Sequence, residues 1–187
     1  MLASLDGEAL IERSANGRVE SVDIPRLLRR WAQAYDVFTT NQTRTFLAPQ
    51  GVRRILERTK GDASLGRLAI TGSFAAVRLA PVAAPALLLA YCDDADILGA
   101  ELGLLPADEG SNVALLRPYD AVVWDRSTLD DGLRYVALSQ VAIDCLTGNG
   151  RMPAEGEALI DRMVQTESQW RLPSLADVYE QVAETSR

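Results

Sequence analysis

An α/β or α+β fold is predicted by the sequence, from two apolar runs and the segment between them. Residues 68–71 and 86–91 are short and almost entirely apolar, which is typical of strands covered on both faces of a sheet. Gly72–Ser73 opens a helix-like segment that Pro81 and Pro85 close, and the Ser73 hydroxyl is expected to cap that helix. This strand–helix–strand pattern predicts the interior of an α/β layer, on which the rest of the chain packs.

The first residues predict a short helix followed by a hairpin. Residues 1–12 carry an incomplete apolar stripe, and Asn16–Gly17 is a strong two-residue hairpin signal. A helix followed at once by a hairpin matches the recognition helix and wing of a winged helix-turn-helix, whose first helices would precede residue 1. The alternative is an ordinary helix–hairpin surface element. We interpret residues 1–22 as a truncated winged-helix remnant.

Residues 23–60 are interpreted as a basic helical connector. A helix is expected over 24–36, a strand over 39–47 and a second helix over 50–60. Arginine and lysine side chains occupy the outward faces of both helices. They form either solvated faces balanced by acid elsewhere, or a surface for phosphates beside a DNA-binding element. The candidate DNA-phosphate contacts are Arg13, Arg18, Arg26, Arg29 and Arg30.

The remaining residues, 61–187, are predicted to form the main α/β domain. The break near residues 60–66 separates a basic front from an acidic back. Beyond the central layer, the patterns predict a helix over 95–102, strands over 112–116, 121–124 and 134–137, and helices over 139–148, 153–167 and 174–185.

The net charge, the absence of histidine and the two cysteines limit the functions that the chain can have. The formal net charge of −7 opposes non-specific binding of nucleic acid by the whole chain, so that DNA contact depends on a local basic surface. The sequence has no histidine, which excludes Ser-His-Asp and Cys-His catalytic pairs and removes the commonest zinc ligand. Cys92 and Cys145 stand in apolar strings and are interpreted as buried structural thiols. We expect no metal and no cofactor.

Two further features concern location. No apolar run approaches the roughly 18 residues that a membrane span needs. The first ten residues lack the basic region and apolar core of a signal peptide. A cytoplasmic protein without membrane contact is therefore expected.

One constellation has the residue types of an enzyme site. A Gly72–Ser73 turn between strand and helix, followed by Asp93, Asp94 and Asp96, is similar to the phosphate-binding turn and metal-binding carboxylates of polymerase-β-like nucleotidyltransferases. The alternative is structural, because the same aspartates can cap the following helix. Other acidic residues are interpreted without a site. Glu155, Glu157 and Asp161 are expected to be solvated. Asp120, Asp125, Asp130 and Asp131 are expected to end strands, with an acidic pocket as the alternative.

Five stretches of the chain resemble the AbiEi-like antitoxin and transcriptional-regulator family of type IV toxin–antitoxin systems. They are LASLDGEALIER, VDIPRLLRRWAQAY, LAITGSFAAVRLAPV, GSNVALLRPYDAVVWDR and GLRYVALSQVAIDCLTGNGRMPAEGEALIDRM, and they follow the family's order over most of the chain. The resemblance implies an N-terminal winged helix-turn-helix and an α/β antitoxin domain. It also implies repression of the protein's own operon and a partner toxin that is nucleotidyltransferase-like.

The resulting expectation is a non-enzymatic antitoxin and transcriptional regulator. Its expected partners are DNA at its own promoter, with the help of a segment that precedes this chain, and a toxin. The alternative hypothesis is a degenerate or active nucleotidyltransferase-like enzyme that uses Asp93, Asp94 or Asp96 with the Gly72–Ser73 turn.

Overall fold

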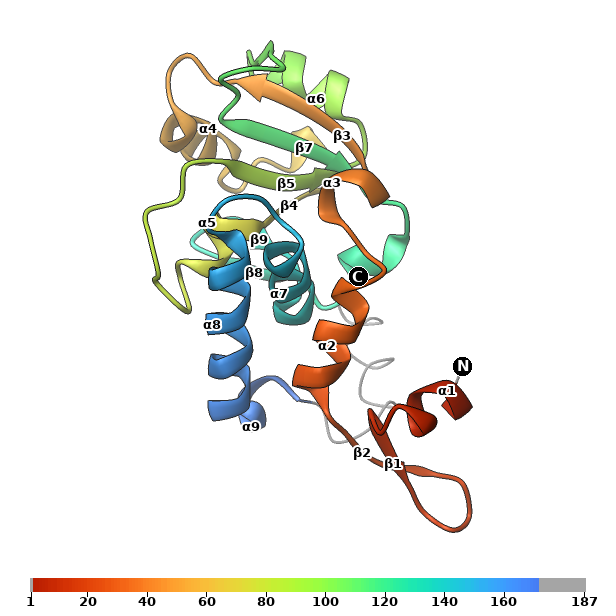
Figure 1. Cartoon of the computed structure of the whole chain (residues 1–187). Helices are drawn as coiled ribbons and strands as arrows, with labels where there is room; N and C mark the ends of the chain where they lie inside the picture. The colour runs from red at the N-terminus through yellow and green to blue at the C-terminus, as the bar shows by residue number, and fades with distance from the viewer. Residues whose placement is uncertain (1, 172–187) are drawn as a thin grey trace.

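A seven-stranded mixed sheet forms the centre of the fold (Figure 1). The structure is a computed structural model, and it describes residues 2–171. The strand order is β6-β3-β7-β5-β4-β9-β8, in which the β5–β7 and β4–β9 pairs are parallel. The strands are β3 (Gln42–Leu47), β4 (Leu68–Thr71), β5 (Leu88–Cys92), β6 (Leu105–Pro106), β7 (Val113–Arg117), β8 (Thr128–Asp130) and β9 (Leu133–Tyr135). The predicted mixed α/β class is confirmed.

The two apolar runs at the predicted centre are neighbouring strands of this sheet. β4 and β5 pair antiparallel, with Leu68 opposite Cys92 and Thr71 opposite Leu89. All of β5 and most of β4 are buried, as expected for strands covered on both faces. Cys92 is buried in β5, and Cys145 is buried in a helix, so that the prediction of buried thiols is also confirmed.

Helices cover both faces of the sheet (Figure 1). One face carries α5 (Gly72–Ala76) and α7 (Leu138–Leu146), on which α2 (Ile24–Ala32) and α8 (Met152–Gln165) pack: α2 contacts α7, and α8 contacts both α5 and α7. The other face carries α4 (Val52–Thr59) and α6 (Ala95–Glu101). Shorter helical turns are α3 (Val37–Thr40), η1 (Ala63–Leu65), η2 (Ala121–Trp124) and α9 (Glu167–Trp170). Within residues 2–171, no helix combines the length and the apolar character that crossing a membrane requires.

The N-terminal helix and hairpin are present, outside the main sheet. α1 (Leu2–Gly7) precedes β1 (Ile11–Arg13) and β2 (Val19–Val22), which pair antiparallel. The helix is shorter than the predicted 1–12, and Ala9 has a positive φ of 52° that no helix can accommodate. Figure 1 shows the hairpin projecting away from the sheet at the lower end of α2. No winged-helix domain is identified in the described part of the chain.

Several expected elements differ from those observed. β3, predicted inside the connector, pairs with β6 and β7 in the main sheet, so that residues 23–60 do not form a purely helical connector. Residues 121–124 form the 3-10 helix η2 in place of a strand, because the Asp120 carboxylate accepts a hydrogen bond from the Val122 amide. The helix expected to extend to residue 36 ends at Ala32. The helix predicted over 174–185 lies outside the described residues.

Candidate functional site

The hairpin carries two of the five arginines predicted to contact DNA phosphates. Arg18 is exposed in the hairpin and has no ion pair among the described residues. Arg13 Nε donates to the Gly17 carbonyl oxygen at 3.1 Å, and its guanidinium lies 3.8 Å from the Asp6 carboxylate. Both side chains belong to the part of the molecule that projects from the body.

The three arginines of α2 contact the protein itself. Arg26 donates to the backbone carbonyls of Glu8 and Ala9, at 3.1 and 3.0 Å, and so fastens to α2 the link between α1 and the hairpin. The Arg29 guanidinium donates to both carboxylate oxygens of Glu157, at 2.6 to 3.2 Å, and this hydrogen bonding raises the pKa of Arg29. Arg30 Nε lies 2.7 Å from the Glu8 carboxylate.

The second basic helix does not extend the same surface. α4, which carries Arg53 and Arg54 on its exposed side, lies at the end of the molecule opposite the hairpin (Figure 1). The two basic helices therefore do not form one phosphate-facing surface. A DNA contact would rest on the hairpin and the adjoining end of α2.

The residues of the nucleotidyltransferase-like constellation lie at opposite ends of two strands. Because β4 and β5 are antiparallel, the Gly72–Ser73 turn follows the end of β4 that lies beside the start of β5, whereas the aspartates follow the other end. Four strand residues separate the two groups by roughly 10 Å or more. The structure therefore does not bring the turn and the carboxylates together.

Each of these aspartates has a structural partner. Asp93 accepts hydrogen bonds from the Arg67 guanidinium at 2.6 to 3.2 Å. Asp94 caps α6 by accepting from the amides of Asp96 and Ile97, at 3.0 and 2.9 Å, and this confirms the capping alternative for Asp94. Asp96 pairs with Arg44 at 3.2 Å. Within residues 2–171, no group of three or more aspartates, glutamates and cysteines is placed to hold a metal ion.

A buried pair joins α5 to α8. The Ser73 hydroxyl donates to Glu155 Oε2 at 2.5 Å, and the Glu155 side chain is only 4% exposed. Thr71, and not Ser73, occupies the N-cap position of α5, so that the predicted cap is wrong. The prediction that Glu155 is solvated is also wrong, because Ser73 supplies the hydrogen bond that a buried carboxylate needs. Glu157 and Asp161 are exposed, as predicted.

The largest buried polar cluster surrounds Asp144 of α7, which is fully buried. Its carboxylate accepts hydrogen bonds from the hydroxyls of Thr71 (2.6 Å), Tyr35 (2.8 Å) and Tyr91 (3.0 Å), and from the Gln140 amide (2.8 Å). Burial raises the pKa of Asp144 to about 6, and the four donors lower it less than burial raises it. Burial also raises the pKa of Tyr35 and of Tyr91, so that both phenols stay protonated and donate.

The Asp144 cluster is closed to large ligands. Asn41 extends it toward the surface, because its amide donates to Tyr35 Oη and its carbonyl accepts from the Tyr119 backbone amide. A cavity of about 10 Å³, room for one water molecule, lies between this cluster and Tyr119. Asp144 can therefore hold a proton in the core. The hydrogen bonds of the cluster also join the sheet and α7 to Tyr35, which follows α2. No sequence pattern singled it out, although a lone aspartate in the apolar string of residues 141–146 was a usable signal.

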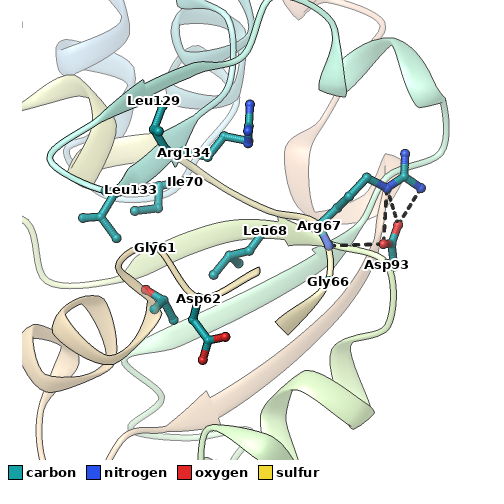
Figure 2. A pocket seen from close by; sticks show the side chains of 12 residues that line it. Gly61, Asp62, Gly66, Arg67, Leu68, Ile70, Asp93, Leu129, Leu133 and Arg134 are labelled. Atoms are coloured by element: carbon teal, nitrogen blue, oxygen red, sulfur yellow. Dashed lines mark hydrogen bonds and ion pairs between the residues drawn. The ribbon is translucent and has the colours of Figure 1, made fainter. Parts of the chain in front are cut away.

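A large open cavity lies beside the C-terminal end of α4 (Figure 2). Its volume is about 590 Å³, within the usual range of small-molecule sites. Four aliphatic side chains line it, namely Leu68, Ile70, Leu129 and Leu133. Asp62, Arg67, Asp93 and Arg134 bring charge to its border. The sequence did not predict this cavity, because its walls come from segments far apart in the chain.

Comparison with protein-family models, with curated proteins and with solved structures found no match for the chain. Function is therefore inferred from the geometry of the molecule and from its sequence.

Proposed function

We propose that this chain is a non-enzymatic regulator of the antitoxin type, acting in the cytoplasm without a cofactor. The observation that carries the proposal is the projecting hairpin with Arg13 and Arg18, whose preceding link at Glu8 and Ala9 is fastened to α2 by Arg26. A projecting hairpin that carries two arginines beside a helix is the arrangement of a wing, with α1 in the place of the preceding helix. The AbiEi-like resemblance supplies the partners, which are the protein's own promoter and a nucleotidyltransferase-like toxin.

The charges of the body support a contact limited to the hairpin. Arg29, Arg30 and Arg67 are each paired with a carboxylate, and the chain as a whole is acidic. Only a few phosphates can therefore be neutralised, and each contact adds salt-dependent affinity without reading the sequence. For this chain alone we expect weak DNA binding with no preference for the promoter.

The DNA part of the proposal is tested by fluorescence anisotropy with labelled promoter and scrambled duplexes at physiological salt. The unmodified chain should bind both with a Kd on the order of 10⁻⁵ M. The double variant Arg13→Glu/Arg18→Glu should weaken binding at least tenfold. Its matched control, Arg53→Glu/Arg54→Glu on α4, makes the same change in net charge far from the hairpin and should have a smaller effect. Equal losses in both variants, or tight promoter-selective binding by the chain alone, would contradict the proposal.

The toxin part is tested by co-expression. A neighbouring gene for a nucleotidyltransferase-like toxin should arrest growth when expressed alone, and this chain should restore growth. If the chain is well expressed and growth is not restored, the proposed antitoxin role is wrong. The alternative enzyme has less support, because Asp94 caps α6 and lies away from the Gly72–Ser73 turn. Magnesium-dependent nucleotide transfer that Asp94→Ala abolishes would reverse this choice.

A further inference from the structure

The open cavity beside α4 is built from elements that the proposed DNA contact does not use. Leu68 and Ile70 of β4 and Leu133 of β9 present aliphatic surface to it. Leu129 of the edge strand β8 stands at its border with 65% of its surface exposed. A large aliphatic side chain this exposed beside a cavity is surface that an apolar ligand would remove from water.

Glycine residues make the cavity wide. Gly61, Gly66 and Gly132 line it, and each has a positive φ, between 65° and 74°. Side chains are disfavoured in this conformation, so that the walls at these positions consist of backbone. The resulting space accommodates a small organic molecule and not only water.

Most of the charges at the border are already paired within the protein. The Arg67 guanidinium donates to both carboxylate oxygens of Asp93, and Figure 2 shows this pair at one side of the cavity. The Asp62 carboxylate accepts from the amide and the hydroxyl of Ser64, at 2.9 and 2.5 Å, and these bonds lower its pKa. Neither carboxylate is left to attract a cationic ligand.

Arg134 differs from the other charged residues of the border. Its guanidinium donates to the Ser127 hydroxyl at 3.1 Å, and it has no carboxylate within ion-pair distance among residues 2–171. It is partly buried, and it stands opposite Leu129 in the β8–β9 pair, where Figure 2 shows the two side chains near each other. A cation without a counter-ion therefore adjoins the most exposed aliphatic side chain of the cavity.

We propose that this cavity binds a small organic anion with an apolar body. Arg134 receives the acid group, because a guanidinium presents several donors in a plane that matches a carboxylate or a sulfonate. Leu129 lies on the same face of the β8–β9 pair as Arg134 and covers the adjoining part of the apolar body, whereas Leu68, Ile70 and Leu133 cover the part that enters the cavity. Binding here is independent of the hairpin, so that this site and the proposed DNA contact stand or fall separately.

Two probes test the proposal on the whole chain. The first is 8-anilinonaphthalene-1-sulfonate, an apolar anion whose fluorescence rises on binding. The second is decanoate, used as a competitor beside the neutral decanol. We expect saturable 1:1 binding of the fluorescent probe, displacement by decanoate, and at least tenfold weaker displacement by decanol.

The variants locate the site. Arg134→Met keeps an aliphatic stem and should weaken binding of both anions about tenfold, because a charge-assisted contact is lost. Its matched control is Arg117→Met, at an exposed arginine of β7 outside the cavity, which should leave binding unchanged. Leu129→Glu should leave the fold intact, because Leu129 is exposed. It should weaken anion binding by placing a negative charge at the border of the cavity. Thermal unfolding confirms that each variant is folded. Equal affinities of Arg134→Met and Arg117→Met, or equal displacement by decanoate and decanol, would overturn the proposal.

Discussion

Hydrogen bonds hold the Asp144 carboxylate in the core, and none of its partners among residues 2–171 is a cation. Four donors surround it, and each belongs to a side chain that is itself buried. Hydrogen bonds replace only part of the hydration that a charge loses on burial, and the pKa is therefore raised. The charged form of Asp144 lowers the free energy of unfolding, which therefore depends on pH.

The first prediction concerns this pH dependence. The pKa of Asp144 rises from 3.8 to about 6 on folding, so the folded protein binds the proton more tightly. Its contribution to stability is present below pH 4 and is lost as the pH rises through 6. The shift is equivalent to about 3 kcal/mol, of which about 2 kcal/mol is lost between pH 4 and pH 7. Urea unfolding at several pH values should therefore show the wild type losing stability relative to Asp144→Asn over this range. A pH-independent difference between the two proteins would show that Asp144 titrates normally.

The second prediction concerns Ser73 and Glu155. Ser73→Ala leaves the buried Glu155 carboxylate without its donor, which should lower the free energy of unfolding by about 1 to 3 kcal/mol. The control is Glu157→Gln on the same helix. Glu157 is exposed and paired with Arg29 at the surface, so its replacement should cost less than about 1 kcal/mol. Chemical denaturation measures both, and an equal effect of the two changes would contradict the assigned role of Ser73.

At the scale of elements, the contact between α7 and α8 depends on a glycine. A Cβ atom at Gly156 would lie 2.7 Å from the Leu146 backbone nitrogen and 3.1 Å from the Ala142 carbonyl oxygen. Backbone atoms cannot move aside as a flexible side chain can. The two helices therefore approach closely only because position 156 has no side chain, and Leu159, Ile160 and Met163 of α8 are buried as a result.

The third prediction follows from this contact. Alanine is the better helix former by about 1 kcal/mol, so intrinsic propensity alone favours Gly156→Ala. We expect the opposite result, a net loss of about 1 to 3 kcal/mol, because the new methyl group forces the helices apart. Gly7→Ala in α1 is the matched control, since nothing lies within 4 Å of its Cβ position, and it should be neutral or stabilising. Thermal melts of both variants check the sign, and a stabilised Gly156→Ala would refute the close approach.

The sequence predicted those elements whose signal is local. The unbroken apolar runs of β4 and β5 and the Asn16–Gly17 turn have short-range causes, and all three were found. Residues 121–124 look like a strand in composition, yet no strand pairs with them, and Asp120 turns them into η2. β3 was recognised as a strand but assigned to a connector, because its partner β7 lies some 70 positions later in the chain.

The candidate sites were harder to predict than the elements. Gly72–Ser73 and Asp93 are near in sequence and match a known pattern, but the antiparallel pairing of β4 with β5 separates them. Asp144 and Tyr35 are 109 positions apart, and only the folded chain places them 2.8 Å from each other. Such sites depend on the strand order, which periodicity and spacing do not determine.

At the scale of the whole molecule, acidic side chains determine which arginines near the hairpin are available to bind phosphates. Arg29 and Arg30 of α2 lie next to the hairpin in sequence, yet Glu157 of α8 and Glu8 hold their guanidinium groups. The net charge of −7 adds a general repulsion toward nucleic acid. Weak DNA binding is therefore expected from two sources, the overall charge and these specific ion pairs, and the two can be separated.

The last prediction separates them with two double variants that change the net charge equally. Glu8→Gln/Glu157→Gln removes the partners of Arg30 and Arg29, which then become available to phosphates beside the hairpin. Affinity for a scrambled duplex should rise, and the slope of log K against log salt should steepen by about 1 to 2, since each added phosphate contact contributes about 0.9. The control, Glu101→Gln/Glu109→Gln, removes two exposed carboxylates that have no ion pair among the described residues. Relief of general repulsion raises affinity in both proteins, but only the first should gain contacts and hence slope. Equal slopes in an anisotropy titration from 50 to 200 mM salt would show that Arg29 and Arg30 do not face DNA even when released.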